Sequence, residues 1–238
     1  MPLKKYSPLV ALPLLAAPLT GLADGVVIDK IYHPYVQPLE QELEWRSIHQ
    51  DEQPSTADNK QLHRLAYGRS LSDRLFTEFY LIAEKSADES FKLEAYEIEA
   101  LWQLSEQGEF WADWGALFEL EKEHEEDVWE AAGGLLVEKE WGRWSTTANL
   151  FVAYEWGSDI EDELESTLGL QARYRYSRAL EPAVEYYQGE ETKAMGPVLL
   201  GQVNLGARRQ VKWEAGAIFG LDNESPNRTL RFLVEFEF

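Results

Sequence analysis

The amino-acid sequence predicts an all-β protein, a closed antiparallel transmembrane β-barrel of about 12 strands. Three observations favour this fold class. Apolar and polar residues alternate along segments of about ten residues, the connections between these segments alternate in length, and no segment after the N-terminus could form a membrane-spanning helix. A helix needs about 20 apolar residues to cross a bilayer, whereas the longest uninterrupted apolar stretch is Ala131–Val137.

The N-terminus has the features of an export signal. Lys4 and Lys5 precede the apolar segment Leu9–Leu19, which is too short and too rich in proline to be a spanning anchor, the alternative interpretation. Small residues at the −3 and −1 positions predict cleavage before Asp24. We therefore expect a signal peptide (residues 1–23), a periplasmic N-terminal segment (24–36) and a transmembrane barrel (37–238). The sequence leaves open whether residues 24–36 plug the lumen.

The alternating segments predict the strands in order along the chain. The last is the clearest, because Phe232, Val234, Phe236 and Phe238 share one face while Arg231 and two glutamates lie on the other. Proline cannot donate a ladder hydrogen bond, so we place position 197 at the beginning of its strand. The predicted strands are 37–48, 60–70, 74–85, 91–104, 111–122, 128–140, 145–156, 164–176, 180–188, 197–206, 211–221 and 229–238.

The connections between these strands fall into two sets. Short turns are predicted at 70–73, 106–109, 142–143, 177–179 and 207–210, and longer polar loops at 51–59, 86–90, 123–127, 157–163, 189–196 and 222–228. Long loops at one end and short turns at the other are typical of outer-membrane barrels. An even number of strands places both termini at the short-turn, periplasmic end.

Composition limits the classes of function. The net charge of −21 argues against nucleic-acid binding, since phosphate groups are neutralised by Lys and Arg. The absence of cysteine excludes disulfides and thiolate metal sites. The 9 Trp and 11 Tyr suit aromatic belts at the two membrane interfaces, because such rings are apolar at one end and polar at the other. We expect these belts to include Trp45, Trp102, Trp114, Trp129, Trp156, Tyr174, Tyr176, Tyr186 and Trp213.

The C-terminal segment resembles the assembly signal of Gram-negative outer-membrane β-barrel proteins. In that class the chain ends on an aromatic residue with apolar residues at alternating positions before it, as Phe232, Val234, Phe236 and Phe238 do here. The strand and loop pattern of the whole mature chain resembles this class, whereas a specific motif is present in the last strand alone. The resemblance indicates no individual family. It implies an outer-membrane location after signal cleavage, contact with outer-membrane lipid and lipopolysaccharide, and recognition by the barrel-assembly machinery. A soluble periplasmic β-sandwich or lipocalin-like cup is the alternative.

Acidic residues dominate the predicted inward faces. We expect Arg173 and Arg175 to face Glu155 on one side and Glu181 or Glu185 on the other. Closure of the barrel should bring Arg231 near the glutamates at 40, 42 and 44. Such a lumen can conduct cations, or it can be a salt-bridge network that fills a narrow barrel. The predicted lumen residues are Glu40, Glu42, Glu44, Glu97, Glu99, Asp113, Glu119, Glu155, Arg173, Arg175, Glu185 and Arg231.

These features favour a porin-like channel or solute-passage protein with a cation-preferring lumen. A non-catalytic structural or surface-interaction barrel is the second hypothesis. A lipid-modifying barrel enzyme is the third, because it needs a Ser–His pair near the lipid-facing wall and only Ser47 beside His49 offers one. We assign no catalytic residue, metal site or cofactor. The acidic loop around His124 (123–127) can attract divalent cations, although a solvated acidic loop is the simpler interpretation.

Removing Phe238, or replacing it with Asp, should block outer-membrane assembly, because the change interrupts the aromatic face that ends the chain. The measurement is the amount of heat-modifiable protein in isolated outer membranes. Normal levels of the truncated protein would contradict the assembly-signal interpretation.

Overall fold

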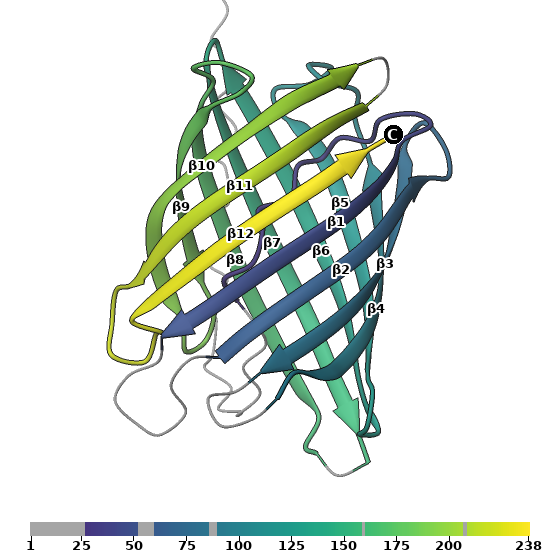
Figure 1. Ribbon diagram of the computed structural model, residues 1–238, viewed down its shortest axis with the longest axis vertical. Helices are drawn as coiled ribbons and strands as arrows, with labels where there is room; N and C mark the ends of the chain where they lie inside the picture. Colours follow the sequence, from purple (N-terminus) through teal and green to yellow (C-terminus); the bar gives the residue numbers. More distant parts are fainter. Residues whose placement is uncertain (1–26, 52–59, 86–89, 159, 207–208) are drawn as a thin grey trace, which may run out of the picture.

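The structure, a computed structural model, is a closed barrel of 12 antiparallel strands (Figure 1). It describes residues 27–51, 60–85, 90–158, 160–206 and 209–238, so the predicted signal peptide lies outside the described residues. The strands are β1 (Gln41–Asp51), β2 (Lys60–Ser70), β3 (Leu75–Lys85), β4 (Lys92–Gln103), β5 (Asp113–Glu123), β6 (Val128–Trp141), β7 (Trp144–Gly157), β8 (Glu163–Tyr174), β9 (Glu181–Gln188), β10 (Lys193–Gly206), β11 (Arg209–Gly220) and β12 (Arg228–Glu237).

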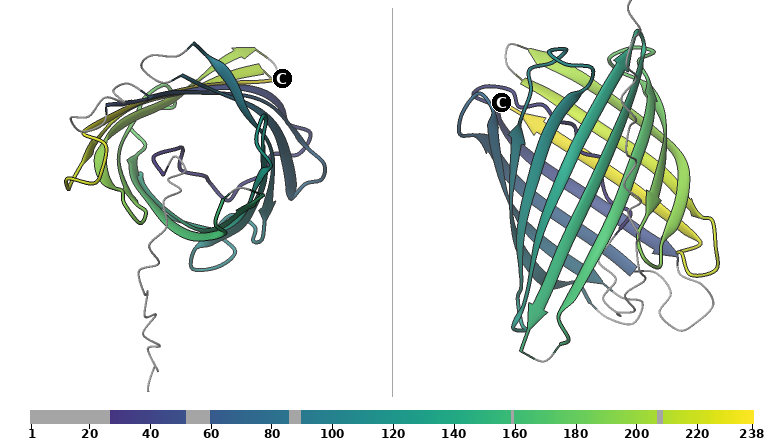
Figure 2. Two further views of the ribbon diagram at one scale, coloured as in Figure 1. Left: turned by 90° about the horizontal axis from the view of Figure 1, so that it is seen from below. Right: turned by 180° about the vertical axis from the view of Figure 1, so that it is seen from behind.

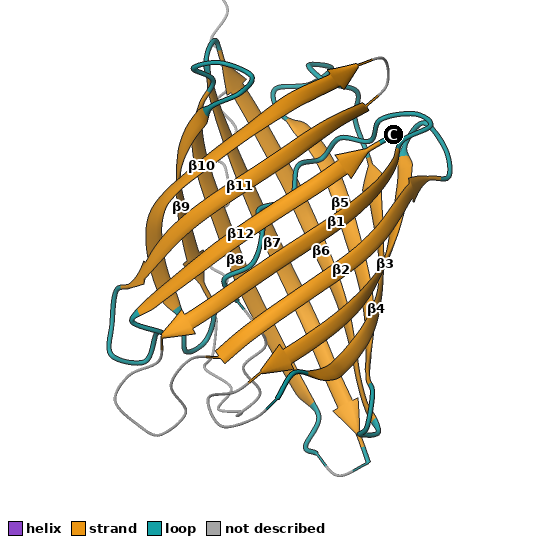
Figure 3. Cartoon of the chain, in the orientation of Figure 1, coloured by secondary structure: helices purple, strands orange, loops and turns teal. Residues whose placement is uncertain are grey.

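Each strand pairs with its neighbours in sequence, and β12 pairs with β1 to close the ring (Figure 2). Closure satisfies the backbone groups that an open sheet edge would leave unpaired in lipid. The cartoon in Figure 3 shows strands and connecting loops only. The described residues contain no helix long and apolar enough to cross a membrane. The predicted fold class is therefore confirmed.

Each of the 12 predicted segments corresponds to one strand, and the largest differences are at two strand beginnings. Strand β1 begins at Gln41, four residues later than expected. Strand β10 begins at Lys193 and continues through Pro197. The proline is tolerated inside the strand because the β10–β11 register passes directly from Met195–Phe219 to Val198–Gly216, so that position 197 lies in a gap of that ladder.

The two faces of the wall differ as the alternation predicts. On β12, Phe232 and Val234 are exposed on the outer surface, whereas Arg231 and Leu233 are buried inside. Exposed aromatic side chains gather at the short-turn ends of the strands, as an interfacial belt requires. Trp45 and Trp213 lie within their strands rather than at an end. The belt residues at this end are Trp102, Phe110, Trp111, Trp141, Trp144 and Tyr176.

The connections differ less in length between the two ends than the sequence suggests. The connection from β4 to β5 covers residues 104–112, longer than the turn expected at 106–109. The connection from β9 to β10 shortens to residues 189–192, because Lys193–Pro197 joins the β9 ladder. The chain nevertheless enters β1 and leaves β12 at the same end of the barrel (Figure 1).

The main departure from expectation is the N-terminal segment. We expected residues 24–36 to lie in the periplasm, but their described part runs through the inside of the barrel (Figure 2). Ile28 packs against Ala194 and Ile218, near the long-loop ends of β10 and β11. At the other end, the backbone N–H of Val36 donates to Gln103, the last residue of β4. We call residues 27–36 the luminal segment.

Epitope tags placed in 123–127 should be stained on intact cells, whereas a tag at Gly142-Arg143 should need permeabilisation. The physical reason is that the strand directions put these connections at opposite ends of the barrel. Staining with the opposite pattern would show that the barrel is inserted the other way round.

Candidate functional site: the barrel lumen

Carboxylates follow one another around the inner wall from strand to strand. Glu42 on β1 is the cross-strand partner of Glu237 on β12, and Glu99 on β4 is the partner of both Glu78 and Glu119. Like charges directly opposite each other are normally destabilising in a sheet. We call these five glutamates the first acidic row. A second acidic row crosses β4 to β7 and consists of Glu97, Glu121, Glu130 and Glu155.

A glycine joins the two halves of the first acidic row. Gly68 on β2 is the cross-strand partner of Glu42 on one side and Glu78 on the other. A Cβ atom at Gly68 would lie 2.9 Å from Cγ of Glu78, closer than packed carbon atoms can approach. The absence of a side chain here leaves room for two side chains of β3, Glu78 and the ring of Phe76, whose Cζ would lie 2.5 Å from the added Cβ.

The luminal segment supplies charges that match this wall. Arg46 and Arg64 are cross-strand partners, and both form ion pairs with Asp29, Arg64 at 2.6 Å. Lys30 Nζ lies 2.7 Å from Oε2 of Glu44. All of these side chains are largely buried, so the segment neutralises charges that would otherwise be costly to remove from water.

Further along, the luminal segment places hydroxyl and imidazole groups against the acids. The Tyr32 hydroxyl donates to Glu99 at 2.6 Å, and the Tyr35 hydroxyl donates to Asp113 at 2.8 Å. His33 Nδ1 lies 2.6 Å from a carboxylate oxygen of Glu138. Gly169 on β8 leaves space for the Ile31 side chain, whose Cδ1 would be 2.6 Å from an added Cβ. The segment is thus held at both walls of the barrel.

Arg173 and Arg175 pair mostly with acids other than those the sequence predicts. Arg173 contacts Glu138 at 3.4 Å and Glu181 at 3.5 Å, and Arg175 pairs with Glu140. The expected partner Glu155 is wrong for both. Small side chains on β7 explain the difference, because Arg173 is opposite Ser145 and reaches over it to β6.

Arg231 is also placed differently from expectation. Its neighbour on β1 is Ile48, whereas the glutamates of β1 lie opposite Glu235 and Glu237. The guanidinium instead lies 2.9 Å from Glu214 and 3.0 Å from Glu185. It reaches these acids because its cross-strand neighbour on β11 is a glycine, residue 216.

A cavity of about 410 Å³ lies between the luminal segment and the wall. It extends towards the long-loop ends of the strands, where Lys60, Glu84 and Glu123 line it. The whole second acidic row also lines it, together with Glu119. Acidic side chains therefore outnumber basic ones in the lining of this cavity.

The structure places the 12 predicted lumen residues on the inside of the barrel or at its short-turn mouth. The alternation of buried and exposed positions identifies those on strands, whereas Glu40 precedes β1 and Arg175 follows β8 at the mouth. Sequence reasoning missed Glu78 and Lys30. Apolar residues on both faces of β3 hid the orientation of Glu78, and no periodicity marks the irregular luminal segment that carries Lys30.

Ser47 and His49 are hydrogen-bonded to each other, but the serine hydroxyl is not accessible from the outer surface. Arg46 and Ile48 point into the lumen, so Ser47 and His49 point outward, with the serine Oγ 2.9 Å from Nε2 of the histidine. Only 1% of Ser47 is exposed, so this hydroxyl is not presented to a lipid ester. The pair satisfies two polar groups on the outer wall.

In the acidic loop 123–127, the carboxylate at its end already has partners. Ser158 Oγ donates to Asp127 at 2.6 Å, and Lys122 Nζ lies 3.5 Å from the same side chain. These contacts hold the pKa of Asp127 below its ordinary value, with the serine hydrogen bond as the largest cause. His124 contacts the Tyr96 hydroxyl at 3.2 Å.

Comparison with known proteins identifies the fold class. No family model matches the sequence, and no curated protein matches it. An outer-membrane channel from Pseudomonas putida F1 aligns with a TM-score of 0.55 at 14% identity, over 92% of this chain and 100% of that one. The KdgM porin in complex with oligogalacturonate aligns with a TM-score of 0.53 at 12% identity, over 83% and 98%. The translocator domain of the autotransporter NalP from Neisseria meningitidis gives 0.50 at 12%, over 85% and 89%. The chain thus has the fold of outer-membrane β-barrels.

Replacing Asp29 with Asn should lower the free energy of unfolding by about 3 kcal/mol, because two buried arginines lose a shared counter-charge. The cost is at the low end of the range for buried pairs since Arg46 keeps Glu44 and Arg64 keeps Glu97. Urea unfolding of the detergent-folded protein measures the change.

The matched control is Asp51→Asn, which removes a pair with Arg228 that is about half exposed. It should cost about 0–1 kcal/mol. Equal losses in the two variants would show that Asp29 does not anchor the luminal segment.

Proposed function

We propose that this protein is a porin-like channel of the Gram-negative outer membrane, with an acidic lumen that prefers cations. The observation that carries the proposal is the series of carboxylates that line the lumen from strand to strand. The barrel fold and the lipid-compatible outer face support the membrane location. The assembly machinery and outer-membrane lipid are the partners that this location implies.

The second acidic row has few bases to neutralise it. Arg64 contacts Glu97, and lies 3.6 Å from Glu121. Glu130 and Glu155 have no ion pair with any residue that the structure describes. Rings and rows of carboxylates raise the local concentration of cations and repel anions. A permeating cation would therefore find successive acidic positions along the cavity.

The luminal segment narrows this path. It crosses the barrel from Ile28 to Val36 and is held by ion pairs and hydrogen bonds at several points along it. We expect cations to pass beside the segment on the side of the second acidic row, where the cavity lies. The unit conductance should consequently be small for a barrel of 12 strands.

A structural or surface-interaction barrel is the second candidate. The same anchored segment favours it, because a lumen filled by a salt-bridged segment gives a rigid body rather than an open pore. Conductance distinguishes the two functions. We propose neither lipid hydrolysis nor another catalytic activity, since the outward Ser47 is buried.

In planar bilayers under a potassium chloride gradient, the reversal potential of the refolded protein should favour potassium. Replacing Glu97, Glu99 and Glu119 together with Gln should reduce this preference, because the variant removes three luminal carboxylates. The effect should be smaller in about 1 M salt, where charges are screened within about 3 Å.

The matched control replaces Glu106, Glu109 and Glu161 with Gln. It changes the net charge equally, but these acids are exposed outside the lumen. A reversal potential that favours chloride in the unmodified protein would contradict the acidic-lumen proposal.

Deleting residues 24–36 should increase the unit conductance, since it removes the segment that narrows the lumen. A protein that conducts only after this deletion would be a closed barrel in its native form, in agreement with the structural candidate. An unchanged conductance would place the ion path outside the lumen described above.

A further inference from the structure

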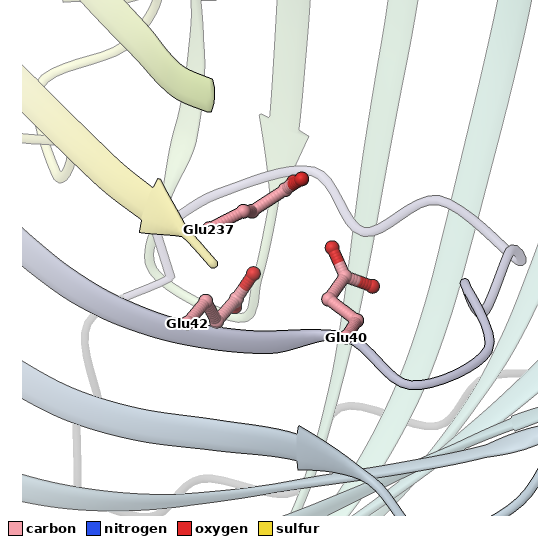
Figure 4. A group of neighbouring side chains, drawn as sticks. All are labelled: Glu40, Glu42 and Glu237. Atoms are coloured by element: carbon pink, nitrogen blue, oxygen red, sulfur yellow. The ribbon is translucent and has the colours of Figure 1, made fainter. Parts of the chain in front are cut away.

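Three carboxylates meet at the short-turn mouth, where the barrel closes. Glu42 is near the start of β1, Glu237 ends β12, and Glu40 lies just before β1 (Figure 4). One oxygen from each side chain can be chosen so that all three lie within 4.8 Å of one another. Glu42 and Glu237 are also cross-strand partners, so two like charges are fixed opposite each other by the register.

One lysine contacts two of these acids, Glu40 and Glu237, and a further one, Glu235. Lys212 Nζ contacts Glu237, lies 3.2 Å from Glu235 and lies 3.8 Å from Glu40. A single ammonium thus pairs with three carboxylates, and Glu42 is a fourth acid beside them. The group keeps an excess of negative charge in a site that is mostly removed from water.

Glu42 is the carboxylate that this lysine does not reach. Only 5% of the residue is exposed, and no hydrogen bond or ion pair joins its side chain to any other described residue. Figure 4 shows its carboxylate turned towards those of Glu40 and Glu237. A buried carboxylate is normally hydrogen-bonded, paired or bound to a metal, so this one lacks a partner that its burial requires.

We propose that Glu40, Glu42 and Glu237 bind a divalent cation, Ca²⁺ in preference to Mg²⁺. Both ions take carboxylate oxygen ligands. Oxygens that lie within 4.8 Å of one another can share one Ca²⁺ at about 2.4 Å. Ca²⁺ also tolerates irregular coordination by side chains fixed in a sheet, whereas Mg²⁺ demands a near-ideal octahedron with bonds of about 2.0–2.1 Å. Water would complete the coordination at the open mouth.

The neighbouring acidic group explains why the site lies at the mouth and not deeper. Glu42 also lies close to Glu44 and Glu78, again with oxygens within 4.8 Å. There, however, Lys30 Nζ is 2.7 Å from Glu44 and 3.7 Å from Glu78. The ammonium of the luminal segment already occupies the position of a cation in that group, and Arg46 binds Glu44 from the other side.

The proposed cation would join the first and last strands of the barrel. Its ligands come from both strands of the β1–β12 pair. Binding would therefore replace the repulsion between Glu42 and Glu237 by a shared bond to the cation. The role is independent of conduction, because a structural barrel would need its closure stabilised equally.

The test is calorimetric titration of CaCl₂ into the refolded full-length mature protein in detergent, with KCl present at constant concentration. We expect one saturable site, with MgCl₂ binding more weakly. Glu42→Gln should weaken Ca²⁺ binding at least about tenfold, since it removes the shared central ligand. Glu106→Gln, an exposed acid in a connection at the same end of the barrel, is the control and should bind as the unmodified protein does.

Lys212→Gln is a second variant that keeps the test decisive if Glu42→Gln does not fold. Removing the competing ammonium should tighten Ca²⁺ binding, whereas a purely structural role for Lys212 would leave it unchanged or weaken it. Heat-modifiable mobility confirms that each variant is folded. Absence of saturable binding to the unmodified protein, or equal affinity in Glu42→Gln, would overturn the proposal.

Discussion

The burial of many carboxylates inside a narrow barrel is the constraint on which the rest of the structure depends. Exposed apolar side chains cover the outer face of the wall, and the period of a strand then places every second residue in the lumen. In this chain many of those residues are glutamates, and they outnumber the luminal arginines and lysines. Their charge must be balanced by cations, and the strands themselves supply too few arginines and lysines to do so.

The luminal segment provides part of this balance. Asp29 forms ion pairs with two adjacent arginines that would otherwise repel each other. Lys30 lies between acids of β1 and β3, Glu44 and Glu78. Tyr32 and Tyr35 add hydroxyl donors where no base is present. The same contacts that hold the segment also narrow the lumen. Stability and permeability are therefore coupled, because loosening the segment would both widen the path and expose unpaired charge.

Two parts of the acidic wall keep an excess of negative charge, with one base for several carboxylates in each. The second acidic row faces the cavity and is available to mobile cations, as the proposed channel function requires. The group at the mouth has fixed geometry and an unpaired buried carboxylate, Glu42, as a bound divalent ion requires. The excess of negative charge thus supports two proposed roles. Acids that face the cavity would attract mobile cations, whereas acids held by the protein at the mouth would bind one divalent ion.

The sequence by itself determined the barrel, the approximate bounds of its strands and the acidic character of its interior. It could do so because the period of two is local, and because the lipid-facing and luminal residues of β12 differ sharply in polarity. Only the tertiary structure decided which charges meet. Partners such as Arg231 and Glu185 lie on strands that are not neighbours, and small residues such as Gly216 and Ser145 allow side chains to reach across a strand. The path of the luminal segment was likewise decided in three dimensions, since its contacts with β1, β4 and β7 depend on the closed ring.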